Sequence, residues 1–188
     1  MKEKILRATA KIIAQDGIKA ASTRTICDAV GITAPTLYYY FEDKSELLKA
    51  VTSFAFDQHM NHLNLENTGG DFAAELRRAW DLYIDFAITQ TELYRTMVIS
   101  VAQGQVLESG FKCFCNLARI FEMARHEGLT KYDAIESSQI YLSAAQGLAL
   151  TMLTLPNRDP EKINILSTNT REVVLGNLMI ANSVLETA

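Results

Sequence analysis

In this chain of 188 residues, a glycine separates two short helical patterns within residues 22–41. Before the glycine, residues 23–30 carry apolar side chains at the i, i+3, i+4 spacing of a helix with one buried face. Gly31 follows, where a left-handed backbone conformation after a helix costs glycine least. A second pattern then begins at Thr33. The spacing therefore predicts two helices joined by a tight turn, which is the helix-turn-helix arrangement.

Local signals predict the ends of both helices. Ser22 is a good N-cap for the first helix, and Thr33 can cap the second. Pro35 falls in the first turn of the second helix, where a missing backbone N–H does no harm. Leu37 is expected in the core, which leaves the tyrosines at 38–40 to cover the remaining surface. Three consecutive tyrosines cannot all be buried on one helix face, so at least one must lie at the protein surface.

The end of this segment, L-Y-Y-Y-F-E-D-K-S-E-L-L, resembles the DNA-binding domain of TetR-family transcriptional regulators. That family's motif runs from a Thr- or Ser-capped helix through I-A-x-x-x-G-[VI]-[ST] to x-x-T-L-Y-x-[HY]-F-x-x-K-x-x-L. The resemblance covers about residues 5–51. Cys27 stands where the family usually has alanine, and Tyr40 where histidine is more common. The matching positions here are Ser22, Ile26, Cys27, Gly31, Ile32, Thr33, Thr36, Leu37, Tyr38, Tyr40, Phe41, Lys44 and Leu47.

The resemblance implies that the second motif helix enters the major groove of DNA. Arg24 can reach a guanine edge or a phosphate, and threonine hydroxyls suit phosphates or base edges, with helix capping as their alternative role. Tyr38 matches the family tyrosine that binds a backbone phosphate, and Lys44 begins the next helix, where its charge and the free N–H groups favour a phosphate. The residues expected to contact DNA are Thr23, Arg24, Thr33, Ala34, Pro35, Thr36, Tyr38, Tyr39 and Lys44.

The charge distribution is compatible with DNA binding although the net charge is −4. Residues 1–50 hold eight Lys and Arg against six Asp and Glu, whereas the remainder holds ten against sixteen. A slightly basic head on an acidic body is a weak electrostatic footprint for nucleic acid. For Lys2 and Lys4, in the first helical pattern, the alternatives are a solvated face and a phosphate contact.

Composition favours a helical protein of the cytoplasm. The 48% hydrophobic content is too high for disorder, and no apolar run is long enough to span a bilayer. Three cysteines, an odd number, argue against a disulfide framework. Cys113 and Cys115 are two apart on a helix and so face different ways; burial is the expected role, with a thiol sensor as the alternative. His59 and His62 have a spacing compatible with a metal, but no further ligand is near, so neither a metal nor a cofactor is expected.

The periodicity predicts an all-α chain of about nine helices. Three helices would form an N-terminal helix-turn-helix head over residues 1–50, with the motif at 22–41. Residues 51–188 would form a helical body for ligand binding and dimerisation. Ser45, Asp71, Thr130 and Asp159 are the expected caps of four of the later helices. The expected helices span residues 2–15, 23–30, 34–41, 45 to about 65, 72–89, 91–102, 105–127, 131–153 and 160–185, with a loop at 67–70.

The last two long helices favour a homodimer. The second of them is apolar around more than one face, and one flank of the first is made small by Ser143, Ala144, Ala145, Gly147 and Ala149. Such wide coverage needs two partners, namely the chain's own body and a second copy. Two joined heads would read a near-palindromic operator in double-stranded DNA.

The body is rich in side chains that either form a plain core or surround a small molecule. The resemblance implies that some of them line an effector cavity, and the absence of charges in the apolar stripes favours a mostly hydrophobic or aromatic effector. The candidates are Trp80, Tyr83, Phe86, Met97, Phe111, Phe114, Phe121, Tyr141 and Gln146.

The resulting hypothesis is a ligand-responsive, sequence-specific DNA-binding regulator, expected to be a repressor that its effector releases from DNA. The alternative is an all-α small-molecule-binding protein or enzyme whose head no longer binds DNA. The sequence shows no Ser/His/Asp order, no phosphate loop and no metal cluster, so an enzyme is not expected.

Overall fold

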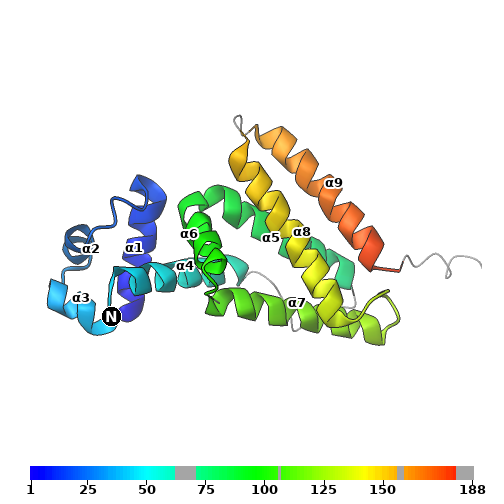
Figure 1. Ribbon diagram of the computed structural model, residues 1–188, viewed down its shortest axis with the longest axis horizontal. Helices are drawn as coiled ribbons and strands as arrows, with labels where there is room; N and C mark the ends of the chain where they lie inside the picture. The colour runs from blue at the N-terminus through cyan, green and yellow to red at the C-terminus, as the bar shows by residue number, and fades with distance from the viewer. Residues whose placement is uncertain (62–70, 106, 156–158, 181–188) are drawn as a thin grey trace, which may run out of the picture. The chain divides into compact units, whose positions relative to one another are not determined.

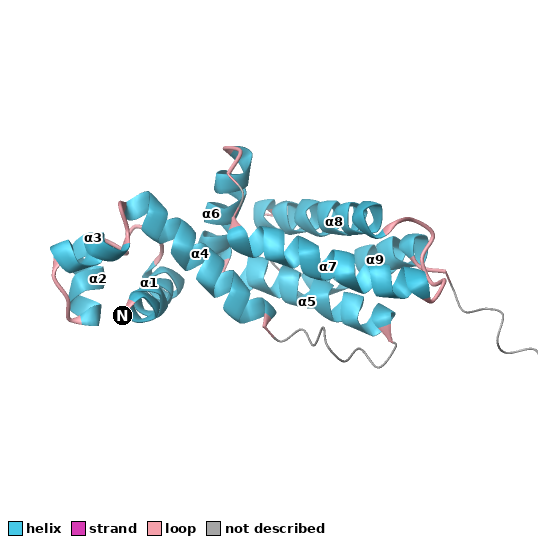
Figure 2. Cartoon of the chain, turned by 90° about the horizontal axis from the view of Figure 1, so that it is seen from below, coloured by secondary structure: helices cyan, strands magenta, loops and turns pink. Residues whose placement is uncertain are grey.

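The computed structural model describes residues 1–61, 71–105, 107–155 and 159–180. Across these ranges the chain is all α-helical, as predicted, and the only β-type pairing is one isolated antiparallel bridge between Thr130 and Met179 (Figure 2). The nine described helices (Figure 1) are α1 (Lys2–Asp16), α2 (Thr23–Val30), α3 (Ala34–Tyr40), α4 (Lys44–Met60), α5 (Phe72–Thr89), α6 (Thr91–Ala102), α7 (Glu108–His126), α8 (Ala134–Thr154) and α9 (Pro160–Leu178).

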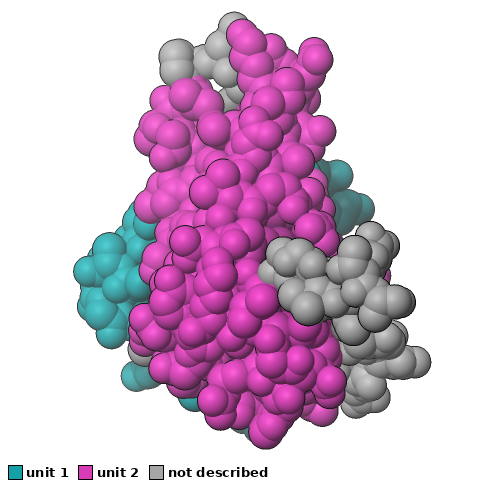
Figure 3. All heavy atoms as spheres, turned by 90° about the vertical axis from the view of Figure 1, so that its right-hand side faces the viewer, with its two compact units in different colours: residues 1–59, 89–111 teal, residues 60–88, 112–188 magenta. Residues whose placement is uncertain are grey.

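The chain forms two compact units, which are coloured separately in Figure 3. Unit 1 comprises residues 1–59 and 89–111, hence the first three helices, most of α4, α6 and the first turn of α7. Unit 2 comprises residues 60–88 and 112–188, and contains nearly all of α5 with the rest of α7, α8 and α9. The functional boundary expected at residue 50 stays a prediction.

Unit 1 is held together by apolar side chains that the helical spacing places on facing surfaces. α1 packs on α2, α2 on α3, and α6 on α1. Full burial of each large aliphatic or aromatic side chain contributes about 1.5–3 kcal/mol. This core fixes the inner sides of α2 and α3 and leaves their outer sides free. The side chains that form it include Ile5, Ile13, Ile26, Val30, Leu37, Phe41, Leu47 and Val51.

The start of α4 differs from the sequence prediction. The helix begins at Lys44, and the carboxylate of Asp43 accepts the backbone N–H of Glu46 at 2.7 Å. Ser45, the predicted cap, therefore lies inside the first turn. Aspartate and serine are comparable N-cap residues. The start of the helix at Lys44, and not the residue type, makes Asp43 the cap.

A second predicted cap is also wrong. α8 begins at Ala134, where the carboxylate of Asp133 accepts the N–H of Glu136 at 2.8 Å. Thr130 lies in the preceding loop and donates its hydroxyl to the carbonyl of Tyr132 at 3.2 Å. The caps predicted at Asp71 and Asp159 are confirmed by side-chain acceptance of a backbone N–H.

The last helix is shorter than predicted. α9 ends at Leu178, because the backbone that follows pairs with the connection between α7 and α8. The N–H of Ile180 donates to the carbonyl of Leu129 at 2.8 Å, and the N–H of Lys131 donates to the carbonyl of Leu178 at 3.0 Å. The part of the expected helix from 181 onward, the end of the expected fourth helix and the loop at 67–70 lie outside the described residues.

Unit 2 consists of α5, α7, α8 and α9, which lie side by side (Figures 1 and 2). Its core is rich in aromatic side chains, and α8 packs along α9. Among the described helices, none combines the length and the apolar character needed to cross a membrane.

Candidate nucleic-acid interface and effector site

The turn between α2 and α3 has the geometry that the sequence predicted. The hydroxyl of Ser22 accepts the N–H of Thr25 at 3.1 Å and so caps α2. Gly31 adopts the left-handed conformation, with φ 75° and ψ 42°. The N–H groups of Gly31 and Ile32 both donate to the carbonyl of Cys27, at 2.8 and 3.0 Å. These bonds close the end of α2 and direct the chain into α3.

The first turn of α3 differs in one detail. Thr33 occupies the N-cap position, but its side chain accepts no backbone N–H. Its hydroxyl instead lies 3.0 Å from the hydroxyl of Thr36. Ala34 is half-buried, and Pro35 is exposed in the first turn, where its missing N–H leaves no gap.

The outer side of α3 presents tyrosine rings. Tyr38 is 47% exposed and Tyr39 is 82% exposed, whereas Leu37 between the helices is buried. Tyr39 meets the half-buried Tyr40 edge-on, with ring centroids 5.1 Å apart. The hydroxyl of Tyr38 lies 3.1 Å from the hydroxyl of Thr23 at the start of α2. The two motif helices therefore share one exposed polar contact.

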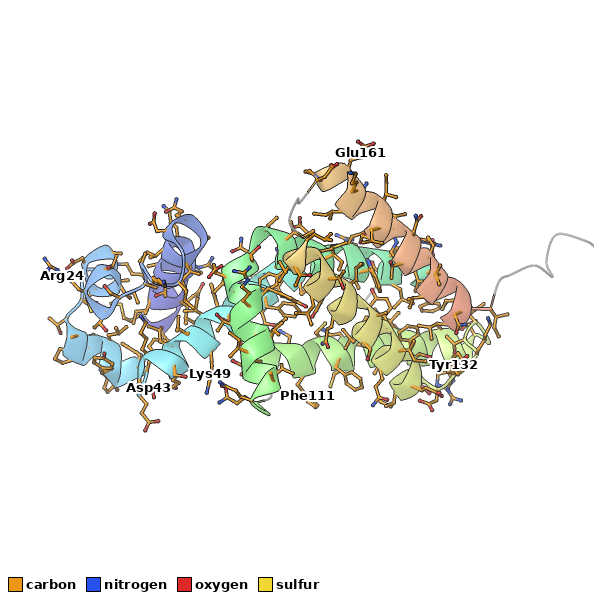
Figure 4. All side chains as sticks on the ribbon, turned by 45° about the horizontal axis from the view of Figure 1, so that its top comes forward. Arg24, Asp43, Lys49, Phe111, Tyr132 and Glu161 are labelled. Atoms are coloured by element: carbon orange, nitrogen blue, oxygen red, sulfur yellow. The ribbon has the colours of Figure 1, made fainter. Side chains whose placement is uncertain are left out.

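Arg24 projects from α2 into solvent, as Figure 4 shows. Its side chain is 92% exposed and pairs with the carboxylate of Asp28, one turn along the helix, at 3.8 Å. An exposed pair at this distance contributes a few tenths of a kcal/mol. The guanidinium can therefore exchange Asp28 for another acceptor at little cost.

Lys44 lies in a more acidic setting than the sequence reasoning assumed. The carboxylate of Asp43 takes the N–H of Glu46, and the carboxylate of Glu46 takes the N–H of Glu42. Two carboxylates thus occupy the end of α4 that was expected to offer free N–H groups to a phosphate. The positive charge of Lys44 remains, and the helix end adds less to anion binding than predicted.

Two lysines of α1 contact the motif in a way that no local pattern indicated. The ammonium of Lys4 donates to the carbonyl of Val30 at 2.9 Å. The ammonium of Lys2 lies over the ring of Phe41, 5.3 Å from its centroid. These partners are 26 and 39 positions away in the sequence, so local spacing gave no signal for them.

The candidate effector residues fall into different environments. Trp80, Tyr83, Phe86, Phe121 and Tyr141 are buried in unit 2, and Met97 is buried on α6 of unit 1. Phe114 is half-buried. Phe111, labelled in Figure 4, lies in the first turn of α7 and is 61% exposed, and Gln146 is also exposed. Both side chains therefore face solvent, whereas the five buried candidates of unit 2 face its core.

Three of these residues form one aromatic cluster whose polar atoms are satisfied. Trp80 meets Tyr141 edge-on at 5.4 Å between centroids, and Phe121 meets Tyr141 at 6.1 Å. The indole N–H of Trp80 donates to the hydroxyl of Ser167 at 3.0 Å, and Tyr141 donates to the carbonyl of Leu76 at 2.6 Å. Burial raises the pKa of Tyr141 well above its usual value, so this hydroxyl stays protonated.

Two cavities lie along the seam between α5 and α9, and none of the nine candidate residues lines either of them. One of about 360 Å³ is bordered by residues that include Phe72, Arg77, Glu172 and Met179. The other, of about 340 Å³, lies toward the opposite ends of the two helices. Neither cavity could be predicted from the sequence, because each forms only where two distant segments meet.

An ion-pair network includes residues that line both cavities: Arg77 and Glu172 line the first, and Asp81 lines the second. Arg77 on α5 pairs with Glu172 on α9 at 2.9 Å, and Glu172 also accepts a hydrogen bond from Arg171 at 2.9 Å. Arg171 in turn pairs with Asp81 on α5. Hydrogen bonding from Arg77 lowers the pKa of the Glu172 carboxyl, against the opposing effect of its partial burial.

The outer faces of α8 and α9 carry apolar side chains that this chain leaves exposed. They accompany the small residues Ser143 and Gly147, which are also exposed. Exposed apolar side chains on two neighbouring helices are compatible with a protein–protein contact. The exposed apolar side chains are Ile135, Ile140 and Leu150 on α8 and Ile165, Leu166 and Val173 on α9.

Known proteins share the sequence of the head and the fold of the chain. Residues 5–51 match the family described as bacterial regulatory proteins, tetR family. The HTH-type transcriptional repressor KstR2 of Mycolicibacterium smegmatis is 24% identical over 151 residues, which cover 66% of this chain and 74% of that protein. The HTH-type transcriptional regulator AcrR of Shigella flexneri is 22% identical over 156 residues, which cover 81% and 69%. The crystal structure of a TetR family transcription regulator from Marinobacter aquaeolei, 22% identical, superposes with a TM-score of 0.61 over 95% of each chain.

A three-helix head whose second and third helices meet at a left-handed glycine, with the outer side of the third exposed, defines a helix-turn-helix DNA-binding protein. Together with the match over residues 5–51, these features place the chain in the TetR family of transcriptional regulators. The resemblance predicted from the motif is confirmed. This family is regulatory rather than catalytic: its members bind DNA operators and small-molecule effectors, typically as dimers.

Proposed function

We propose that this regulator reads a near-palindromic DNA operator as a homodimer, with α3 of each copy in successive major grooves. The observation that carries the proposal is the exposure of Tyr38 and Tyr39 on the outer side of α3, whose inner side is buried through Leu37. Two neighbouring tyrosine rings that are exposed on one helix combine apolar surface with polar hydroxyl tips, which is typical of a binding surface. A nucleic-acid groove, with its sugars, bases and phosphates, fits such rings and their hydroxyl groups.

The proposed contacts divide by chemistry. Thr23, Tyr38 and Lys44 would bind backbone phosphates and set the position of the head. Arg24, free to leave Asp28, would reach a guanine edge or a phosphate. The remaining proposed contacts are to base edges and thymine methyl groups, and they come from Thr33, Ala34, Pro35, Thr36 and Tyr39.

The proposed dimer uses the outer faces of α8 and α9. The exposed apolar residues on these helices would bury one another across a two-fold axis, and the small side chains at Ser143 and Gly147 would allow close helix approach. Light scattering at micromolar concentration should show a dimer, and Val173→Glu should convert it to a monomer. Arg78→Glu, an exposed charge reversal on α5, is the control and should leave the dimer intact.

The proposed effector is a small, mostly hydrophobic or aromatic molecule that binds among the buried aromatic residues of unit 2. The support is the cluster of Trp80, Phe121 and Tyr141, which is apolar except for two satisfied polar atoms. The effector would favour head positions that cannot both fit the operator, so that the protein acts as a repressor. A thermal-shift screen in which only charged metabolites stabilise the protein would contradict this proposal.

The experiment that tests the function is selection of bound sequences from random double-stranded DNA. Enrichment of a near-palindrome, bound less tightly at higher salt, would support the proposal. Failure to enrich any sequence, with small molecules still raising the melting temperature, would favour the alternative of a helical ligand-binding protein or enzyme. Candidate effectors can then be tested by competition against the selected DNA.

A further inference from the structure

Lys4 stands out in the head because its charge is directed into the protein and not toward the outer side of the motif. Its ammonium donates a 2.9 Å hydrogen bond to the carbonyl of Val30, the last residue of α2. The contact is partly buried, although the lysine is otherwise exposed. A cation at this place also faces the negative end of the α2 helix dipole.

The hydrogen bonds around the turn show what this contact adds. The last carbonyls of a helix have no partner within the helix. The carbonyl of Cys27 accepts from both Gly31 and Ile32, whereas the carbonyl of Val30 accepts from Lys4. The lysine thus satisfies a carbonyl at the point where α2 ends and the turn to α3 begins.

A second contact from the same turn of α1 reaches the other motif helix. The ammonium of Lys2 lies over the ring of Phe41, which directly follows α3 and is buried. A cation over an aromatic face contributes about 0.5–1 kcal/mol at exposed sites. The first turn of α1 therefore holds the end of α2 through one ammonium and the end of α3 through another.

We infer that Lys4 is a positioning residue for DNA binding: it fixes the end of α2, and through the three-residue turn it sets the direction in which α3 meets the groove. It does not touch DNA in this role. The inference rests on the proposed function, because it assumes that α3 is the reading helix. In this role the ammonium of Lys4 binds a carbonyl within the protein, whereas its charge alone would suggest a contact with a DNA phosphate.

The salt dependence of binding separates these two roles. A lysine that neutralises a phosphate contributes about 0.9 to the slope of log affinity against log salt, whereas a positioning lysine contributes nothing to that slope. The protein is titrated against its selected operator at several KCl concentrations, at a temperature where circular dichroism shows every variant fully folded. Variants are Lys4→Met, which removes the hydrogen bond and the charge, and Lys4→Arg, which keeps both. Lys11→Met, an exposed position on the same helix with the same charge change, is the control.

We expect Lys4→Met to weaken operator binding about five- to tenfold at every salt concentration without changing the slope. Lys4→Arg should recover most of the affinity, and Lys11→Met should leave it within about twofold. A slope reduced by about 0.9 in Lys4→Met would assign the lysine to a phosphate and overturn the inference. Unchanged affinity in Lys4→Met would also overturn it.

Hydrogen exchange measured without DNA tests the restraint at the end of α2 independently of operator binding. Hydrogen exchange of the backbone amides of Gly31 and Ile32 should become faster in Lys4→Met and remain unchanged in Lys11→Met, because the end of α2 loses its restraint. Faster exchange with no operator binding by the wild-type protein would mean that the proposed function fails while the restraint is real. Unchanged exchange would overturn the inference whether or not the protein binds DNA.

Discussion

The hydroxyl groups of Thr23 and Tyr38 lie 3.1 Å apart, so the first residue of α2 is hydrogen bonded to the middle of α3. Either hydroxyl can donate to the other, which leaves one proton free to bind a phosphate oxygen. The pair is uncharged and lies on the proposed DNA side of the head.

This contact predicts that the two residues act together in DNA binding. Thr23→Val and Tyr38→Phe should each weaken operator binding, and the double variant should lose less than the sum of the two. The expected coupling is about 0.5–1.5 kcal/mol, since each single change already breaks the shared hydrogen bond. Fluorescence anisotropy with labelled operator measures all four proteins. Strictly additive losses would show that the hydroxyls act independently.

Arg24 and Lys44 should give different signatures in the same assay. Lys44→Ala should weaken binding to all sequences and reduce the salt slope by about 0.9, although the carboxylates of Asp43 and Glu46 beside it will make the loss of affinity small. Arg24→Ala should in addition relax the preference at one operator position by about 1–3 kcal/mol. Repeating the sequence selection with each variant tests this, and an unchanged preference with Arg24→Ala would assign that side chain to a phosphate.

Gly31 should not tolerate a side chain. Its φ of 75° is unfavourable for an L residue, so Gly31→Ala should lower the free energy of unfolding by about 1–2 kcal/mol. Apart from the adjoining residues, no heavy atom lies within 4 Å of the added methyl group, so the cost is conformational and does not come from crowding. Gly110→Ala, inside α7 and equally uncrowded, is the matched control and should stabilise by about 0.5–1 kcal/mol. Urea denaturation compares the two, and equal effects would contradict the argument.

Ser167 should matter for stability because Trp80 depends on it. The indole N–H of Trp80 is fully buried and donates to the Ser167 hydroxyl at 3.0 Å. Ser167→Ala would leave that N–H without a partner and should cost about 1–3 kcal/mol of unfolding free energy. Thr170→Ala, at a half-buried position on the same helix where the hydroxyl makes a solvent-exposed hydrogen bond to the carbonyl of Leu166, should cost much less. If both variants unfold at the same urea concentration, water replaces the serine at little cost.

The pair of Arg77 and Glu172 predicts a weak acid sensitivity. The folded state lowers the pKa of Glu172, so this group adds stability above its unfolded pKa of about 4.3 and loses it as the pH falls through the folded value. Both side chains are more than 40% exposed, so solvent screening keeps the effect small. Glu172→Gln should therefore flatten the decline of the unfolding free energy between about pH 5 and 3. Added salt should flatten it in the wild-type protein, and an unaltered decline in Glu172→Gln would assign the sensitivity to other carboxyl groups.

Local sequence was sufficient where the decisive interaction lies within one turn. Ser22, Gly31 and Asp159 could be placed because each acts on backbone groups no more than four positions away. The caps at Asp43 and Asp133 were missed for a related reason. Another residue type that caps helices well lies within three positions of each, Ser45 near Asp43 and Thr130 near Asp133, and N-cap propensity does not distinguish such neighbours.

Interactions between distant segments could not be predicted. The end of α9 is set by pairing between Ile180 and Leu129, and the contact of Lys4 with Val30 joins positions 26 apart. The candidate effector residues show the same limit. Phe111 and Trp80 have similar apolar neighbours in sequence, but one is exposed and the other is fully buried. Only packing between helices decides which aromatic residues face an interior.

The burial of Trp80 has a practical consequence, because it is the single tryptophan in the chain. Its indole is enclosed, bonded to Ser167 on α9 and set edge-on to Tyr141 on α8. Intrinsic fluorescence excited at the red edge therefore reports on one spot, the junction of three helices in unit 2. The molecule carries its own optical probe at that junction, and the head, which has no tryptophan, adds no competing emission.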